Sequence, residues 1–105
     1  MVNGEPCKGW LHGIPIAIKD LSIVQGIPMT LGELSLFQNC VPDFSDALVQ
    51  RLINAGVIVI GKTNTPKHGI ESHTYNSWWG TTSNPFDLTK SASGSSGGAS
   101  VAIVP

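Results

Sequence analysis

A short helical pattern followed directly by a run of β-branched residues is the feature that most limits how this chain can fold. Apolar residues recur at helical spacing over residues 46–54, with Ser45 or Asp46 available as the N-cap, and Gly56 then supplies a helix stop. Residues 57–60 follow as Val-Ile-Val-Ile, which is typical of a strand buried on both faces of a parallel sheet. An earlier apolar run at residues 14–18 predicts the partner strand, with its proline confined to the beginning. Strand, helix and strand in this order predict a βαβ-like unit of an α/β fold, with a right-handed connection.

The segments around this unit are predicted mostly as loops. Residues 1–13 are rich in glycine and proline and predict an irregular lead-in, and residues 21–39 predict a long loop with one helical turn. Thr65-Pro66 resembles a helix start with proline at the first helical position. Residues 74–88 predict an extended loop that is anchored by its aromatic side chains.

The segment from residue 91 to residue 100 consists almost entirely of serine, glycine and alanine. A flexible linker is the default interpretation of such a composition. Residues 99–104 follow at once, however, and fit the first turns of a buried helix. A Gly/Ser turn at a helix N-terminus exposes backbone N–H groups, which suit an anion or an oxyanion.

The chain carries few charges for its size. Charged residues make up 12% of the 105 residues, against about 25% in globular domains, while 41% are hydrophobic. This composition predicts a surface that is covered by further protein, with self-association through that apolar surface as one consequence; a compact, weakly charged monomer is the alternative. A net charge of −1 with scattered basic residues provides no electrostatic reason for nucleic-acid binding.

The N-terminus and the cysteines predict a cytoplasmic setting. Glu5 and Pro6 stand where a secretory signal would carry an apolar stretch. No apolar run approaches the roughly 20 residues that a membrane span needs. Cys7 and Cys40 form no close pair, so we expect reduced thiols.

Two ligand signals in the sequence are rejected. Residues 56–63 match the phosphate-loop pattern G-x-x-x-x-G-K-[ST], but the four middle positions are Val-Ile-Val-Ile, which favours a strand over a loop around phosphate oxygens. Lys62 is then interpreted as an ordinary lysine at a strand end. His12, His68 and His73 share no metal-ligand spacing, so no metal site is predicted.

Two segments together indicate chemistry. Lys19 ends the predicted strand at residues 14–18, where burial would lower the pKa of its amine and make it a proton acceptor. The Ser95-Ser96-Gly97-Gly98 turn can present a hydroxyl, because glycine lets the backbone approach closely. A Ser-Lys site is therefore one interpretation of these residues; a surface lysine beside a Gly/Ser linker is the other.

At this point the chain resembles the amidase-signature family. Residues 9–20 follow the family pattern G-x-L-H-G-[IV]-P-[IV]-x-[IV]-K-D, and residues 91–100 follow its G-G-S-S-G-G-[SA] segment. Between them, residues 57–64 resemble V-I-[IVL]-G-K-T-N and residues 80–87 resemble G-x-[TP]-x-N-P-[WFY]-D. These motifs agree with the family in order and spacing over residues 9–104, nearly the whole chain.

The resemblance implies a Ser–cis-Ser–Lys triad on an α/β fold built around a mixed sheet flanked by helices. Lys19 matches the family base and Ser95 matches the bridging serine, which is held by a cis peptide bond. Ser96, Gly97 and Gly98 would support the turn. The chemistry implied is amide hydrolysis through an acyl-enzyme, without a cofactor, on a small-molecule amide that the sequence does not identify.

Departures from the family pattern set further expectations. The family nucleophile lies in a D-x-G-G-S segment about two dozen residues beyond the bridging serine, and the chain stops at Pro105. We therefore expect residues 1–105 to be an incomplete part of one amidase-signature domain, from a truncated or decayed gene, and inactive alone. A non-catalytic module that binds a small anion or a partner is the alternative. Ser93 stands where the family usually has glycine, which would strain the turn if a positive φ is needed.

Overall fold

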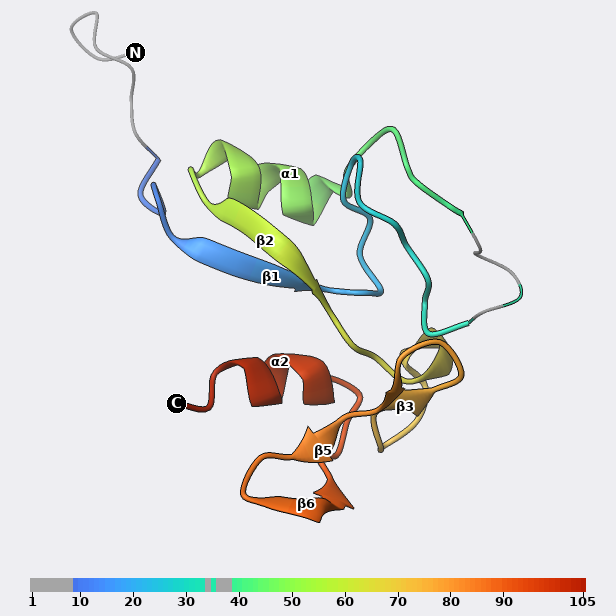
Figure 1. Cartoon of the computed structure of the whole chain (residues 1–105). Coiled ribbons are helices and arrows are strands. Elements are labelled where there is room, and N and C mark those ends of the chain that lie inside the picture. Colours follow the sequence, from blue (N-terminus) through green and yellow to red (C-terminus); the bar gives the residue numbers. More distant parts are fainter. Residues whose placement is uncertain (1–8, 34, 36–38) are drawn as a thin grey trace, which may run out of the picture.

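A parallel strand pair with one covering helix forms the centre of the fold. The structure is a computed structural model that describes residues 9–33, 35 and 39–105. Strands β1 (Pro15–Lys19) and β2 (Ile58–Thr63) pair in parallel, and α1 (Ala47–Asn54) lies over one face of the pair (Figure 1). The predicted βαβ-like unit and α/β class are confirmed, although β2 begins one residue later than predicted and continues to Thr63. Residues 1–8 of the predicted lead-in, with Cys7, lie outside the described residues.

The small apolar core lies between this strand pair and α1. Val49 of α1 is only 1% exposed and packs in one cluster with Ile18 and Val24. Side chains of the same face complete the cluster: Ile16, Ile27, Leu52 and Val59. Neighbouring residues of a strand point to opposite faces of the sheet. Ile16 and Ile18 therefore reach this core, while Ala17 between them does not.

Two polar side chains before α1 fasten the long loop to the helix instead of capping the helix. Asp46 occupies the N-cap position, as predicted, but makes no side-chain cap hydrogen bond. Its carboxylate accepts a hydrogen bond from the backbone N–H of Ile23 at 2.8 Å, and Ser45 Oγ accepts one from Gln25 N at 2.9 Å. The described part of residues 21–39 contains no helix. The predicted helical turn had no fixed position in this range, and residues 34 and 36–38 lie outside the described residues.

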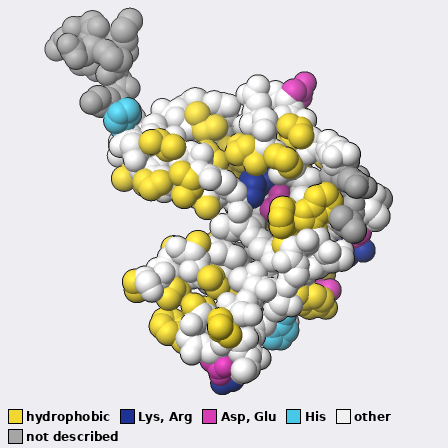
Figure 2. All heavy atoms as spheres, in the orientation of Figure 1, with side chains coloured by type: hydrophobic (Ala, Val, Ile, Leu, Met, Phe, Trp, Pro, Cys, Tyr) yellow, Lys and Arg dark blue, Asp and Glu magenta, His cyan; other side chains and the backbone are white. Residues whose placement is uncertain are grey.

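The prediction that residues 57–60 are buried on both faces is wrong. Val57 is buried, but Ile58 and Ile60 of β2 are 55% and 68% exposed. The reason is that α1 covers only the face to which Val59 points, so the opposite face of the strand pair stays open at these two isoleucines. Figure 2 shows hydrophobic side chains gathered at the surface of the part of the molecule that contains β1, β2 and α1. A hollow separates them from a second group of hydrophobic side chains.

The rest of the chain forms short elements. The predicted loop at residues 74–88 contains antiparallel pairs of very short strands, β3 (Tyr75–Asn76) with β4 (Gly80–Thr81) and β5 (Ser83–Asn84) with β6 (Asp87–Ser91). In the described part of the chain these strands and the β1–β2 pair make three separate two-stranded sheets. The helix start predicted at Thr65-Pro66 is a single 3₁₀ turn, η1 (Lys67–Gly69), with Pro66 at its N-cap.

The final helix begins earlier and is more exposed than predicted. Helix α2 (Gly97–Ala102) starts inside the Gly/Ser segment, which is therefore ordered structure and not a linker. Within α2 only Gly97 is buried, so the prediction of a buried helix at residues 99–104 is wrong. Helix α2 lies against the carboxyl-terminal ends of β1 and β2 (Figure 1), and its first residue, Gly97, also contacts Thr74.

The asymmetry between the two faces of β2 predicts different responses to truncation. Val49→Ala should lower the free energy of unfolding by about 2 kcal/mol, because it removes two buried methyl groups and leaves a cavity. Ile60→Thr keeps a β-branched side chain at an exposed position. It should change the free energy of unfolding by less than about 0.5 kcal/mol. Urea unfolding of the dilute chain, followed by tryptophan fluorescence, measures both values. Equal losses at the two positions would contradict the one-sided core.

We propose that the open isoleucine face, Ile58 and Ile60, takes a second copy of the chain. Sedimentation velocity should show a concentration-dependent dimer that Ile60→Lys abolishes, because burying that ammonium against a second apolar face is costly. Leu88→Lys, at another exposed apolar position on β6, is the matched control and should leave the dimer intact. A wild-type chain that stays monomeric across the concentration series would refute this.

Candidate active site

Lys19 and the Ser95-Ser96 pair lie together although 76 and 77 positions separate them. Lys19 is the last residue of β1, and its Nζ donates to Ser95 Oγ at 2.7 Å and to Ser96 Oγ at 2.9 Å. The hydrogen bond expected between Lys19 and Ser95 is present. It forms because the carboxyl-terminal ends of β1 and β2 meet the beginning of α2 (Figure 1).

The turn that presents the two hydroxyls is held by a buried threonine. The peptide bond between Gly94 and Ser95 is cis, as the family resemblance implies. Thr74 Oγ1 donates to the carbonyl oxygen of Ser93 at 2.8 Å and accepts from the N–H of Gly97 at 3.0 Å, so one fully buried side chain fixes both ends of the turn.

Gly97 and Gly98 are required by close approach. A Cβ on Gly97 would collide with Thr74 Oγ1, and a Cβ on Gly98 would collide with the backbone nitrogen of Asn64. Any larger residue would push α2 away from the strand ends. These two glycines therefore support the turn, as expected.

Ser93 adopts the strained conformation that its departure from the family pattern predicts. Its φ is 59°, in the left-handed region that disfavours residues with a Cβ. The sequence left open whether this position needs a positive φ, and the structure has one there.

The surroundings of Lys19 lower the pKa of its amine and so raise the share of the neutral form. Burial lowers the pKa of the Lys19 amine, because the charged form loses hydration. The ion pairs of the described residues do not include Lys19, so no carboxylate in direct contact opposes this effect. A neutral amine at 2.7 Å from a serine hydroxyl has the geometry of a general base.

Lys62 is not the ordinary strand-end lysine of the sequence interpretation. The side chain is 10% exposed, and its Nζ forms an ion pair with Asp20 Oδ1 at 2.8 Å. The rejection of a phosphate loop is confirmed, because Gly61, Lys62 and Thr63 belong to strand β2.

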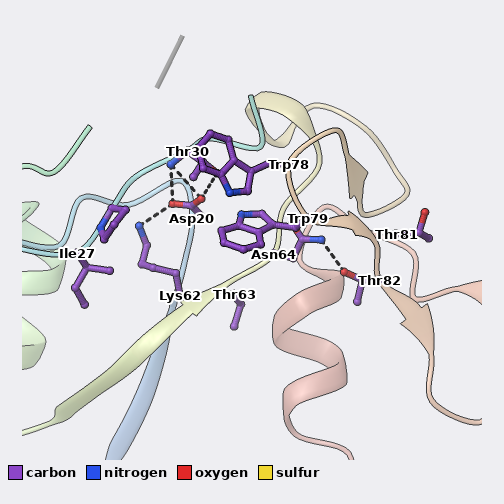
Figure 3. A pocket seen from close by; sticks show the side chains of 11 residues that line it. Asp20, Ile27, Thr30, Lys62, Thr63, Asn64, Trp78, Trp79, Thr81 and Thr82 are labelled. Carbon is purple, nitrogen blue, oxygen red and sulfur yellow. Dashed lines mark hydrogen bonds and ion pairs between the residues drawn. The ribbon is translucent and has the colours of Figure 1, made fainter. Parts of the chain in front are cut away.

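A cavity lies beside this ion pair. It measures about 630 Å³ and is lined by apolar and polar side chains that include Trp78, Trp79 and Asn64 (Figure 3). Among the described lining residues neither Lys19 nor Ser95 occurs, so the cavity and the Lys-Ser cluster are separate features of the fold.

The histidines lie apart from this cluster. His73 Nδ1 is 2.7 Å from Ser91 Oγ, and His68 Nε2 is 3.9 Å from Glu33 Oε2. The described residues contain no group of three or more His, Cys, Asp or Glu side chains able to hold a metal ion. Nor does any helix in the described part of the chain have the length and hydropathy to cross a membrane.

Sequence reasoning missed the polar network behind the turn. Asn76 Nδ2 donates to Asn64 Oδ1 at 2.6 Å and to the carbonyl oxygen of Thr65 at 2.7 Å, and Asn64 Nδ2 donates to Thr82 Oγ1 at 2.9 Å. Asn64 belongs to one of the family motifs, but the motif alone assigned it no role. Nothing in the sequence around Thr74 marks it as the residue that holds the turn.

Comparison with known proteins gives matches over nearly the whole chain. Residues 3–104 match the family described as Amidase. A glutamyl-tRNA(Gln) amidotransferase subunit from Trichodesmium erythraeum (strain IMS101) is 44% identical over 95 residues, which are 90% of this chain and 19% of that protein. The corresponding amidotransferase subunit from Methanosarcina acetivorans is 37% identical over 102 residues, 97% of this chain and 21% of that protein.

Solved structures show the same likeness. The structure of the glutamyl-tRNA(Gln) amidotransferase subunit from Thermotoga maritima has a TM-score of 0.84 at 35% identity and covers 93% of this chain and 22% of its own. The structure of 6-aminohexanoate cyclic dimer hydrolase has a TM-score of 0.83 at 36% identity, with 90% and 20% covered. The chain spans about a fifth of the length of the relatives that it matches. On this extent of agreement in sequence and fold, the chain belongs to the amidase family.

Proposed function

We propose that this chain supplies the proton-relay part of an amide-hydrolysing site, with Lys19 as the base and Ser95 as the bridging serine. The single observation that supports this best is the 2.7 Å contact between Lys19 Nζ and Ser95 Oγ, made by a lysine whose pKa is lowered by burial. An ordinary surface lysine would be charged near neutral pH and would not accept a proton.

In the proposed relay, a nucleophilic serine hydroxyl attacks the amide carbonyl and passes its proton to Ser95 Oγ, which passes its own proton to Lys19 Nζ. The proton then returns by the same path to the amine that leaves. Water hydrolyses the acyl-enzyme in the reverse sequence and releases the acid. We place the nucleophile outside the 105 residues, because Ser95 and Ser96 are both held by Lys19 and the chain contains no D-x-G-G-S segment.

The relatives support an amide as the substrate class without selecting one amide. Their names refer to a tRNA-dependent amidotransferase, a cyclic-dimer hydrolase of 6-aminohexanoate and an aryl acylamidase. We propose a small-molecule amide and no cofactor. The alternative of a small-anion site at the turn has less support, because the first N–H group of α2, that of Gly97, already donates to Thr74 Oγ1.

A chimeric enzyme tests the assigned roles. We would replace the matching segment of 6-aminohexanoate cyclic dimer hydrolase with residues 9–104 and measure opening of its cyclic dimer. In an active chimera, Lys19→Ala and Ser95→Ala should each lower kcat by about 10²- to 10⁴-fold, the usual contribution of general acid–base groups. Lys90→Ala, at an exposed lysine on β6, is the matched control and should have no effect.

Two further measurements separate a base from a structural cation. Lys19→Arg keeps the positive charge but cannot be deprotonated, so it should be as inactive as Lys19→Ala. The kcat/KM of the chimera should fall as pH falls and Lys19 becomes protonated. Since burial lowers the pKa of Lys19, that fall should occur at lower pH than an exposed lysine would produce. An active Lys19→Arg chimera would exclude Lys19 as the base.

The isolated chain should hydrolyse no simple amide above background. A serine near Lys19 cannot replace the nucleophile unless oxyanion donors also face it, and losing even one such donor typically costs about 10²–10³ in rate. Purified chain and its Lys19→Ala variant would be compared by ammonia or amine release from several amides. Turnover in the wild type that disappears in the variant would show that the chain contains a competent nucleophile.

A further inference from the structure

Asp20 carries a buried negative charge at the same end of β1 as the proposed base. It follows Lys19 in the sequence, and its carboxylate is only 5% exposed. Asp20 Oδ2 accepts from Thr30 Oγ1 at 2.5 Å and from Thr30 N at 3.2 Å, and Oδ1 accepts from Lys62 Nζ at 2.8 Å (Figure 3). All of these contacts lie on the cavity side of the strand ends.

The two lysines point to opposite faces of the same strand pair. In the parallel register Ile18 is opposite Lys62, whereas Lys19 is opposite Thr63. Ile18 faces the core beneath α1, so Lys62 lies on that side and Lys19 on the side of α2. Asp20 shares the side of Lys62, since alternate positions share a face.

Asp20 and Lys62 are the charged groups that neighbour Lys19 along the described β1–β2 pair at this end. The segment packed against the serine turn, residues 71–74, adds Glu71 and His73, both of them exposed. Helix α2 and the turn before it, residues 93–102, contain no titratable side chain, and β2 contributes only Lys62. Without Lys62, the Asp20 carboxylate would lose its ion-pair partner, and its charge would favour the protonated form of Lys19, the preceding residue.

We propose that Lys62 is an electrostatic positioning residue for the site: by pairing with Asp20 on the far face of the strand pair, it cancels the charge that would otherwise hold a proton on Lys19. The importance of this for catalysis rests on the proposed role of Lys19 as a base. The charge balance itself concerns only three described residues and is measurable without turnover.

Removing the charges of Lys62 and Asp20 one at a time should shift the pKa of Lys19 in opposite directions, and removing both should cancel the shifts. Lys62→Met leaves the Asp20 charge unpaired and should raise the pKa of Lys19; Asp20→Asn leaves the Lys62 charge unpaired and should lower it. The double variant, which carries neither charge, should return to the wild-type value. Trace acetylation of the chain by acetic anhydride across a pH series, with mass spectrometry of the Lys19 peptide, reports the fraction of neutral amine.

At a pH below the pKa of Lys19, each single variant should change its acetylation rate at least about twofold in opposite directions. That is the effect of one unit charge at roughly 10 Å in bulk water, and it grows as the dielectric constant falls. Lys90 is the internal reference in every sample, because its side chain is exposed on β6.

Two matched variants distinguish charge from packing. Lys62→Arg keeps the charge and should leave the pKa of Lys19 near the wild-type value, while Thr30→Val removes a hydrogen bond to Asp20 without removing a charge. Thr30→Val should therefore lower stability in urea but not shift Lys19 titration. Far-UV circular dichroism checks that each variant is folded. If one single variant unfolds, the remaining single variant should still shift the pKa of Lys19, and the double variant should restore it.

The inference would be overturned if both single variants shift the pKa of Lys19 in the same direction or leave it unchanged. The ion pair would then have a purely structural role. Opposite shifts with restoration in the double variant would establish it. If opposite shifts appear while the Lys19→Ala chimera stays active, the charge balance holds and the proposed catalytic function fails. The two failures are therefore distinguishable.

Discussion

The parallel pairing of β1 with β2 is the interaction on which the rest of the structure depends. It brings residues 15–19 beside residues 58–63 across a long connection that contains α1, and it places both strand ends at one edge. Lys19 and Lys62 leave that edge on opposite faces. One face then meets the turn before α2, and the other meets the Asp20 carboxylate and the cavity lined by Trp78 and Trp79 (Figure 3).

The site combines the flexible side chain of Lys19 with a rigid serine turn. The long side chain of Lys19 can adopt many conformations, so the geometry of the contact must be fixed by the position of the serines. Their turn is fixed by Thr74 at both ends and by the close approach of Gly97 and Gly98 to the strand region. In the proposed relay, preorganisation of this kind would let a proton move between fixed oxygens and one amine without reorganising the surroundings.

The two faces of the β1–β2 pair serve different purposes: one packs into the core, and the other carries the proposed site. On the α1 face, three buried apolar residues and their neighbours form a small core that holds the strands in register. On the α2 face, the strand pair is open at Ile58 and Ile60 and closed only at Lys19. Stability and chemistry are thus separated by the alternation of side chains along β1, which sends Ile18 into the core and Lys19 to the serines.

Local pattern determined the elements, and tertiary structure determined their surroundings. The helix at residues 47–54, the parallel partner strands and the rejection of the phosphate loop followed from periodicity and β-branched composition, because these signals act within a few residues. The motifs also singled out Lys19 and Ser95, which the structure brings into contact. Sequence could not reveal that Ile58 and Ile60 are open, that Lys62 is paired with Asp20, or that Thr74 holds the serine turn. Each depends on which distant segment packs against which face, and burial and ion pairing are decided by that packing rather than by any local pattern.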